Sequence, residues 1–130
     1  MMFTRRSLAK FALLALVLPR PALASNETPF TRAAFEAAQK SGKSILIEIH
    51  ASWCPTCRAQ KPIIDSLLTT PKFMDVVTFR IDFDAQMDEV RAMGAQSQST
   101  LIGFKGTKET TRSVGDTDPA SIEQLLASVV

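Results

Sequence analysis

Positions 44–50 follow a period-two pattern, with Ile45, Ile47 and Ile49 on one side and Leu46, Glu48 and His50 on the other. Such alternation is typical of a half-buried β-strand. The same pattern returns in three later segments, 76–82, 100–105 and 109–114. Because only a short turn at Gly106 separates the last two, they predict a β-hairpin.

Apolar residues at helical spacing fill the stretches between these strands. Helices are predicted over 31–41, from the cysteine pair to residue 68, over 85–93, and from Pro119 onward. Ser25–Pro29 is interpreted as a polar linker. The predicted order is therefore αβαβαββα, which favours an α/β domain: a central mixed sheet with helices on both faces.

The first 24 residues do not share these patterns. A basic head with Arg5, Arg6 and Lys10 precedes the apolar run Phe11–Leu18 and a small-residue site, Ala22-Leu23-Ala24. This layout is typical of a secretory signal peptide, and the apolar run is shorter than the roughly 20 residues that span a bilayer. We therefore expect a signal peptide at 1–24 and one domain at 25–130, with an uncleaved anchor as the alternative.

The leader also changes the expected location and charge. Thr4–Lys10 resembles a twin-arginine export signal, and both this route and the general secretory route lead to the bacterial periplasm. Four of the 15 basic residues lie in the leader, so 11 remain against 13 acidic residues. The remaining domain is slightly acidic, which gives no support to nucleic-acid binding.

The chain has two cysteines, Cys54 and Cys57, at the point where a strand pattern gives way to a helical one. Unpaired N–H groups and a partial positive charge at the first turn of a helix favour a thiolate over a thiol. Cys54 is therefore expected to attack and the deeper Cys57 to resolve. A structural zinc site would need four ligands, with His50 as the only further candidate, and an inert buried pair is the other alternative.

The flanking residues complete a recognisable motif. The segment ILIEIHASWCPTCRAQKP has an acid, Glu48, six residues before the first cysteine, Trp53 directly before it and Pro62 five residues after the second. It resembles the active-site region of thioredoxin-like proteins, and the likeness extends from about Phe30 to the C-terminus. WCPTCRA is similar to the motif of periplasmic thioredoxins of cytochrome c maturation, although this chain looks too short for their central insert. The resemblance implies a thioredoxin fold.

The same resemblance assigns a role to Glu48. In thioredoxin-like proteins the acid at this offset lies beneath the cysteines and accepts the proton of the residue equivalent to Cys57. Burial would raise the pKa of Glu48 and suit it to proton transfer near neutral pH. The alternative is an edge-strand glutamate that faces water. Arg80, on a neighbouring predicted strand, is its candidate charge partner.

Substrate contacts are expected from five residues: Trp53, Pro55, Thr56, Ser99 and Thr100. Thioredoxin-like proteins place a cis-proline that pairs with the substrate backbone where this chain has Ser99. A cis bond without proline costs about 2.5 to 4 kcal/mol, so the Gln98–Ser99 bond is predicted to be trans or strained. The serine could also leave the sulfurs open to a metal.

Together these features predict a periplasmic thiol-disulfide oxidoreductase, acting as a reductase on protein disulfides through Cys54 and Cys57. The Cys54–Cys57 disulfide is itself the redox centre, so no organic cofactor and no metal are expected. A membrane electron donor would re-reduce the protein, which we expect to be a monomer. The alternatives are a copper- or zinc-binding metallochaperone that uses the two cysteines, with or without His50, and a binding module with idle cysteines.

Overall fold

The computed structural model describes residues 27–130. The predicted signal peptide, residues 1–24, lies outside the described residues and stays a prediction. Within the described part of the chain, no helix is both long and apolar enough to cross a membrane.

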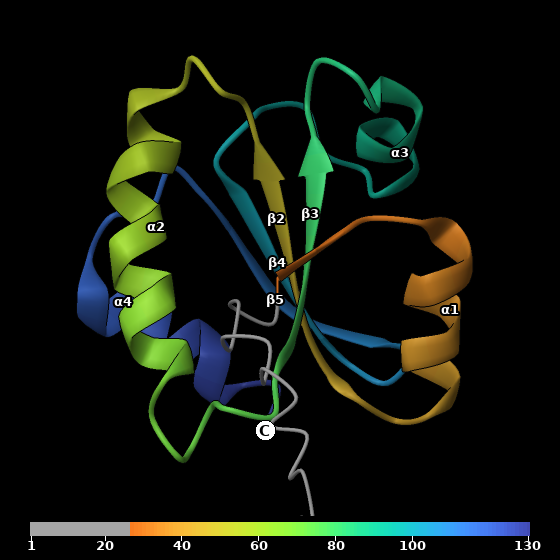
Figure 1. Ribbon diagram of the computed structural model, residues 1–130, viewed down its shortest axis with the longest axis vertical. Coiled ribbons are helices and arrows are strands. Elements are labelled where there is room, and N and C mark those ends of the chain that lie inside the picture. Colours follow the sequence, from red (N-terminus) through yellow and green to blue (C-terminus); the bar gives the residue numbers. More distant parts are fainter. Residues whose placement is uncertain (1–26) are drawn as a thin grey trace, which may run out of the picture.

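A five-stranded sheet forms the centre of the molecule (Figure 1). Its strands are β1 (Glu27–Pro29), β2 (Ser44–His50), β3 (Val77–Asp82), β4 (Thr100–Lys105) and β5 (Lys108–Val114). They lie in the order β1-β3-β2-β4-β5. β1 and β2 flank β3 in parallel, whereas β4 runs antiparallel to both β2 and β5. The predicted mixed sheet and its terminal hairpin are confirmed.

The first strand, β1, corrects the interpretation of 25–29 as a polar linker. Its three residues pair in parallel with β3, with Glu27 opposite Thr78 and Pro29 opposite Arg80. A proline is tolerated because β1 is an edge strand, where a missing backbone donor breaks no ladder. Three residues without an apolar alternation carry no strand signal, so only the pairing with β3 reveals this strand.

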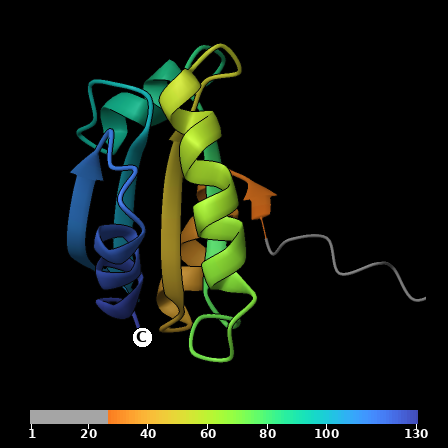
Figure 2. The same cartoon turned by 90° about the vertical axis from the view of Figure 1, so that its left-hand side faces the viewer.

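Helices cover both faces of the sheet. They are α1 (Arg32–Lys40), α2 (Pro55–Leu68), α3 (Met87–Ala92) and α4 (Pro119–Ala127). α2 and α4 lie on one face and α1 and α3 on the other (Figure 1), and the turned view shows α2 and α4 side by side in front of the sheet (Figure 2). This is the predicted architecture, with helices on both faces.

The helix ends follow local chemistry. Asp118 caps α4 by accepting the backbone N–H of Ser121, and Pro119 occupies the first helical position as expected. α3 is shorter than the predicted 85–93, because the carboxylate of Asp82 accepts the N–H groups of Asp84 and Ala85 and holds them in a turn. The helix therefore begins only at Met87.

The alternation along β2 separates two hydrophobic cores. Ile45, Ile47 and Ile49 pack under α1 and α3, while Leu46 packs with Ile64 of α2 on the opposite face. β2 lies between β3 and β4, so both of its edges are hydrogen-bonded. A polar side chain on the α2 face of this strand is therefore surrounded by protein, and that is where Glu48 stands.

Candidate active site

The two cysteines stand at the N-terminus of α2, directly after β2. Cys54 is the N-cap residue, with an extended backbone, and its Sγ accepts the backbone N–H of Cys57 at 3.1 Å. Pro55 takes the first helical position, where no backbone donor is needed. Both cysteines are free thiols and belong to one small buried cluster with Ala51. The first turn of α2 thus directs an N–H group at the Cys54 sulfur.

The surroundings of the two sulfurs push their pKa values apart. Burial raises the pKa of Cys54, but hydrogen bonds from the side chain and N–H of Cys57, the Ser99 hydroxyl and the N–H of Thr56 outweigh it, and the net pKa is lowered. The pKa of Cys57 is raised, first by burial and then by its hydrogen bond with Cys54. Cys54 is the better thiolate, and Cys57 needs a base.

Exposure does not distinguish the two sulfurs. Cys54 is 1% and Cys57 4% exposed. The expectation that Cys57 is the more deeply buried of the two is therefore wrong. The preceding residue, Trp53, is 52% exposed. The difference between the two cysteines is therefore one of hydrogen bonding and charge rather than of access.

Glu48 is a buried acid in a central strand, 9% exposed, on the face of β2 that lies under α2. The alternative of an edge-strand glutamate in water is wrong. Burial, and after it the nearby charge of Glu27, raise its pKa to about 7 against the opposing influence of Arg80 and Lys61. A carboxyl group with this pKa exchanges protons close to neutral pH.

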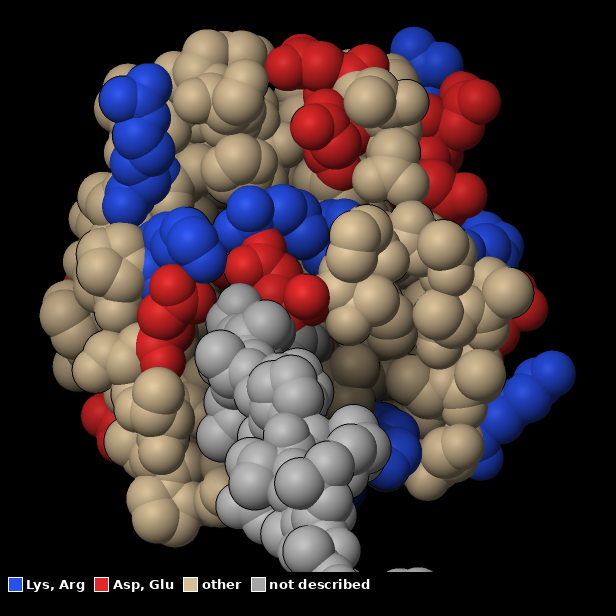
Figure 3. Space-filling view, in the orientation of Figure 1, with Lys and Arg blue, Asp and Glu red and all other residues tan. Residues whose placement is uncertain are grey.

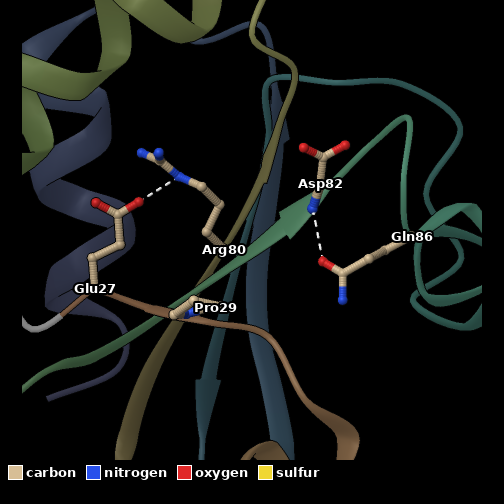
Figure 4. Close-up of a pocket in the computed structure, with 5 residues that line it drawn as sticks. All are labelled: Glu27, Pro29, Arg80, Asp82 and Gln86. Atoms are coloured by element: carbon tan, nitrogen blue, oxygen red, sulfur yellow. Dashed lines mark hydrogen bonds and ion pairs between the residues drawn. The ribbon is translucent and has the colours of Figure 1, made fainter.

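Arg80 lies on the neighbouring strand, as expected, but its ion-pair partner is not Glu48. It lies opposite Glu48 in the β2–β3 ladder, whereas its Nε forms an ion pair with Glu27 of β1 (Figure 4). Lys61 of α2 completes the cluster, with its Nζ 3.2 Å from Glu27 Oε2 and 3.0 Å from Asp65 Oδ2. Figure 3 shows acidic and basic side chains meeting in the middle of this face of the molecule.

Beside this cluster lies an open hollow of about 380 Å³. It is lined by Glu27, Pro29, Arg80, Asp82 and Gln86 (Figure 4). The Gln86 side chain links the end of β3 to the segment after β1. It accepts the N–H of Asp82 at 3.0 Å and donates to the carbonyl of Phe30 at 3.0 Å. β1 thus encloses one side of the charged network around Glu48.

His50 ends β2 opposite Asp82 and on the same face as Glu48. Its pKa is lowered, mainly by burial and next by Arg80. Among residues 27–130 no three His, Cys, Asp or Glu side chains are grouped so that they could hold a metal ion. His50, Cys54 and Cys57 therefore do not form the three-ligand site that was one form of the metallochaperone alternative.

Trp53 is anchored from the loop between β3 and α3. Its Nε1 donates to Oδ2 of Asp84 at 2.8 Å, which orients the half-exposed ring beside the cysteines. The two following substrate candidates open α2, with Pro55 exposed and Thr56 half-buried. Sequence analysis missed Asp84, since nothing in its local pattern distinguishes it from the other acids of 82–89.

Ser99 confirms the prediction about its peptide bond. Residues 27–130 contain no cis peptide bond, and Ser99 has a φ of 57°, so the bond is trans and the backbone strained. Its Oγ lies 3.8 Å from Cys54 Sγ. Thr100, the next substrate candidate, is 1% exposed and donates its hydroxyl to the carbonyl of Ser97 at 2.8 Å, so it holds the loop rather than facing solvent.

A second residue that sequence analysis missed is Gln60. It is 4% exposed on α2, and its Nε2 donates to the carbonyls of Ser99 at 3.2 Å and Asp116 at 2.9 Å. A signal was present in the spacing, because Gln60 follows Cys57 by three residues and therefore lies on the same buried helix face.

Known proteins resemble this chain in sequence and in fold. Residues 26–128 match the family model of thioredoxin. The chain is 34% identical to Thioredoxin-2 of Saccharomyces cerevisiae over 97 residues, 74% of this chain and 90% of that protein. It is 31% identical to Thioredoxin of Chlamydia muridarum, over 64% of this chain and 79% of that protein. The crystal structure of Trxlp from Edwardsiella tarda superposes with a TM-score of 0.74 at 35% identity, covering 77% of this chain and 96% of that chain.

Proposed function

Because the chain belongs to the thioredoxin family, with its fold and its protein-disulfide oxidoreductase activity, we propose that it reduces disulfides of proteins in the periplasm. The observation that carries this proposal is the Cys54 sulfur, which caps α2 and accepts the N–H of Cys57. A sulfur held in this way is a thiolate at a lower pH than an ordinary cysteine.

In the first step the Cys54 thiolate attacks one sulfur of a substrate disulfide. The substrate S–S bond breaks, a mixed disulfide forms on Cys54, and the other substrate sulfur leaves as a thiolate that takes a proton from water. Trp53, Pro55 and Thr56 border Cys54 along the chain, and Ser99 lies against its sulfur, so these residues are proposed to contact the substrate.

In the second step Cys57 gives its proton to Glu48 and attacks Cys54 Sγ. The mixed disulfide breaks, the second substrate sulfur leaves as a thiolate that takes a proton from water, and the Cys54–Cys57 disulfide remains, so two electrons have passed to the substrate. The raised pKa of Cys57 means that this step needs a base. Glu48, with a pKa of about 7, is suited to accept the proton and return it to water.

The oxidised pair must be reduced again, and we propose that a membrane electron donor does this. The Cys54–Cys57 disulfide is then the only redox centre required, without an organic cofactor or a metal. The proposed location rests on the leader pattern of residues 1–24, a basic head, an apolar run and a small-residue cleavage site. The domain is proposed to act as a monomer.

Insulin reduction with dithiothreitol tests the activity. The wild-type protein is expected to accelerate insulin precipitation, Cys54→Ser to abolish the effect, and Cys57→Ser to accumulate a mixed disulfide that mass spectrometry detects. Ser52→Ala, an exposed neighbour of the pair, serves as the matched control. Wild-type activity that persists in Cys54→Ser would contradict the proposal.

Expression of the full chain in a bacterium tests the location. The N-terminal sequence of the protein in the periplasmic fraction is expected to begin at Ser25. Retention of the uncleaved chain in the cytoplasm would contradict the periplasmic location and leave the activity proposal untouched.

A redox potential near −270 mV, as in thioredoxin, marks a reductant, whereas one near −120 mV marks an oxidant.

A further inference from the structure

Ser99 is the one non-glycine residue within 27–130 that has a positive φ, 57°. This left-handed conformation is uncommon for a residue with a side chain, and its strain persists only where the surroundings hold the backbone in place. The strained residue is also in contact with the nucleophile, because Ser99 Oγ lies 3.8 Å from Cys54 Sγ. Strain held against a reacting atom points to a role in the chemistry.

Three hydrogen bonds hold the Ser99 backbone in place. Its N–H donates to the carbonyl of Ile49, at the end of β2, at 2.7 Å. Its carbonyl accepts the N–H of Gly115 at 3.0 Å and Nε2 of Gln60 at 3.2 Å. Gln60 is itself anchored to the carbonyl of Asp116 at 2.9 Å and is almost fully buried. The backbone is therefore fixed at both its N–H and its carbonyl, and with it the direction of the Cα–Cβ bond of Ser99.

The interaction between the hydroxyl and the sulfur depends on the protonation of Cys54. When Cys54 is a thiol, its S–H can donate to Ser99 Oγ, which is a weak hydrogen bond. When Cys54 is a thiolate, the hydroxyl of Ser99 is the group that carries the hydrogen and must be the donor. A hydrogen bond to an ionised acceptor is roughly twice as strong as a neutral one, so this contact favours the thiolate.

We propose that the Ser99 hydroxyl is a further catalytic group, which donates a hydrogen bond to the Cys54 thiolate, and that Gln60 is a positioning residue that holds Ser99 for this purpose. A proline, which thioredoxin-like proteins have at this position, offers no such donor. The serine thus adds a hydroxyl donor to the donors that the first turn of α2 supplies. This inference rests on the proposed function, since it concerns the same nucleophile.

The direct test is the pKa of the Cys54 thiol, followed by thiolate absorbance at 240 nm in Ser99→Gly. Glycine adopts a φ of 57° without strain, so this variant removes the hydroxyl and spares the backbone. We expect the pKa of Cys54 to rise by about half a unit to one unit, which makes the thiolate fraction at acidic pH roughly three- to tenfold smaller. The thermal midpoint should stay equal or increase.

Two further variants distinguish the effect of the Ser99 hydroxyl on the pKa of Cys54 from an effect on the stability of the fold. Ser99→Thr keeps a hydroxyl and is expected to keep the low pKa of Cys54, although it loses stability because a branched side chain is strained at positive φ. Ser97→Ala, in the same loop, is the matched control and is expected to change neither quantity. The redox potential of Ser99→Gly should become more negative by up to about 30 mV, which corresponds to a tenfold change in the equilibrium constant of the two-electron couple. An unchanged pKa in Ser99→Gly would overturn the proposal.

A double-mutant cycle tests Gln60. Gln60→Met alone is expected to raise the pKa of Cys54 and to have no further effect in the Ser99→Gly background, because it acts through Ser99. An equal shift in both backgrounds would overturn the positioning role. The pKa is measured without turnover, so failure of this inference is distinct from failure of the proposed function, which an inactive wild-type protein in the insulin assay would reveal.

Discussion

Arg80 lies directly opposite Glu48 in the β2–β3 ladder, yet its guanidinium forms its ion pair with Glu27 of β1. Glu48 is therefore buried beside a cation that another carboxylate already neutralises. Burial then dominates, and the pKa of Glu48 rises to about 7. An edge strand of three residues thus influences the pKa of the buried acid Glu48.

The first prediction concerns stability. The folded protein holds the Glu48 proton up to a pH of about 7, whereas the unfolded chain releases it near 4.5. The unfolded state binds fewer protons between these values, so Glu48 lowers the free energy of unfolding as pH rises through this window, by up to about 3 kcal/mol. Glu48→Gln should lose this dependence and be more stable than wild type at pH 8.

Urea unfolding of the reduced protein from pH 4.5 to 8 measures this effect. Glu36→Gln, an exposed glutamate on α1, is the control and should follow the wild-type curve. A Glu48→Gln variant that is less stable than wild type at pH 8 would mean that the fold stabilises the Glu48 carboxylate, which is the opposite of the predicted effect.

The second prediction concerns the release step. Without the Glu48 carboxylate, Cys57 lacks its proton acceptor, and resolution of the mixed disulfide should slow by about a hundredfold at pH 7 in Glu48→Gln. Attack by Cys54 should be spared, so its alkylation rate should not change. Quenched-flow trapping of the mixed disulfide separates the two steps, and slowing of attack alone would assign Glu48 to Cys54 instead.

The third prediction is a pair of opposite shifts. Glu27→Gln removes a negative charge and releases Arg80 toward Glu48, so the pKa of Glu48 should fall below about 7. Arg80→Met removes a positive charge and should raise that pKa, while Glu27 keeps Lys61 as its partner. Carbon-13 NMR titration of the Glu48 carboxyl measures both, and shifts of the same sign would exclude the proposed competition for Arg80.

The fourth prediction concerns Trp53, the single tryptophan of the chain, which makes its fluorescence a clean probe. Asp84→Ala removes the acceptor of its indole N–H and should free the ring. We expect stronger acrylamide quenching and a several-fold weaker apparent affinity for protein substrates, as for the loss of about 1 kcal/mol. Asp88→Ala, a fully exposed neighbour on α3, should leave both unchanged.

Much of the fold could be predicted from the sequence because its signals are local. Alternation defined the strand at 44–50, and the Asp118-Pro119 pair defined the start of the last helix. β1 could not be found in this way, because its existence depends on pairing with β3 rather than on its own residues. The family model, which begins at residue 26, includes this strand.

The site was predictable only where a motif marked it. The place of the cysteines at the start of a helix followed from the chain order, whereas the register that sets Arg80 opposite Glu48 could not be derived from the sequence. Nor could the ion pair of Arg80, because its partner comes from the missed strand. Contacts across distant segments, such as that between Gln60 and Ser99, depend on the packing of α2 against the loop before β4.

The pH dependence of alkylation of the reduced protein by iodoacetamide, with the modified cysteine identified by mass spectrometry, tests most directly whether Cys54 is the activated nucleophile. Cys54 is expected to react first, with an apparent pKa below that of a free cysteine, while Cys57 reacts only at higher pH. Two thiols that both stay unreactive at neutral pH, or earlier reaction of Cys57, would contradict this assignment.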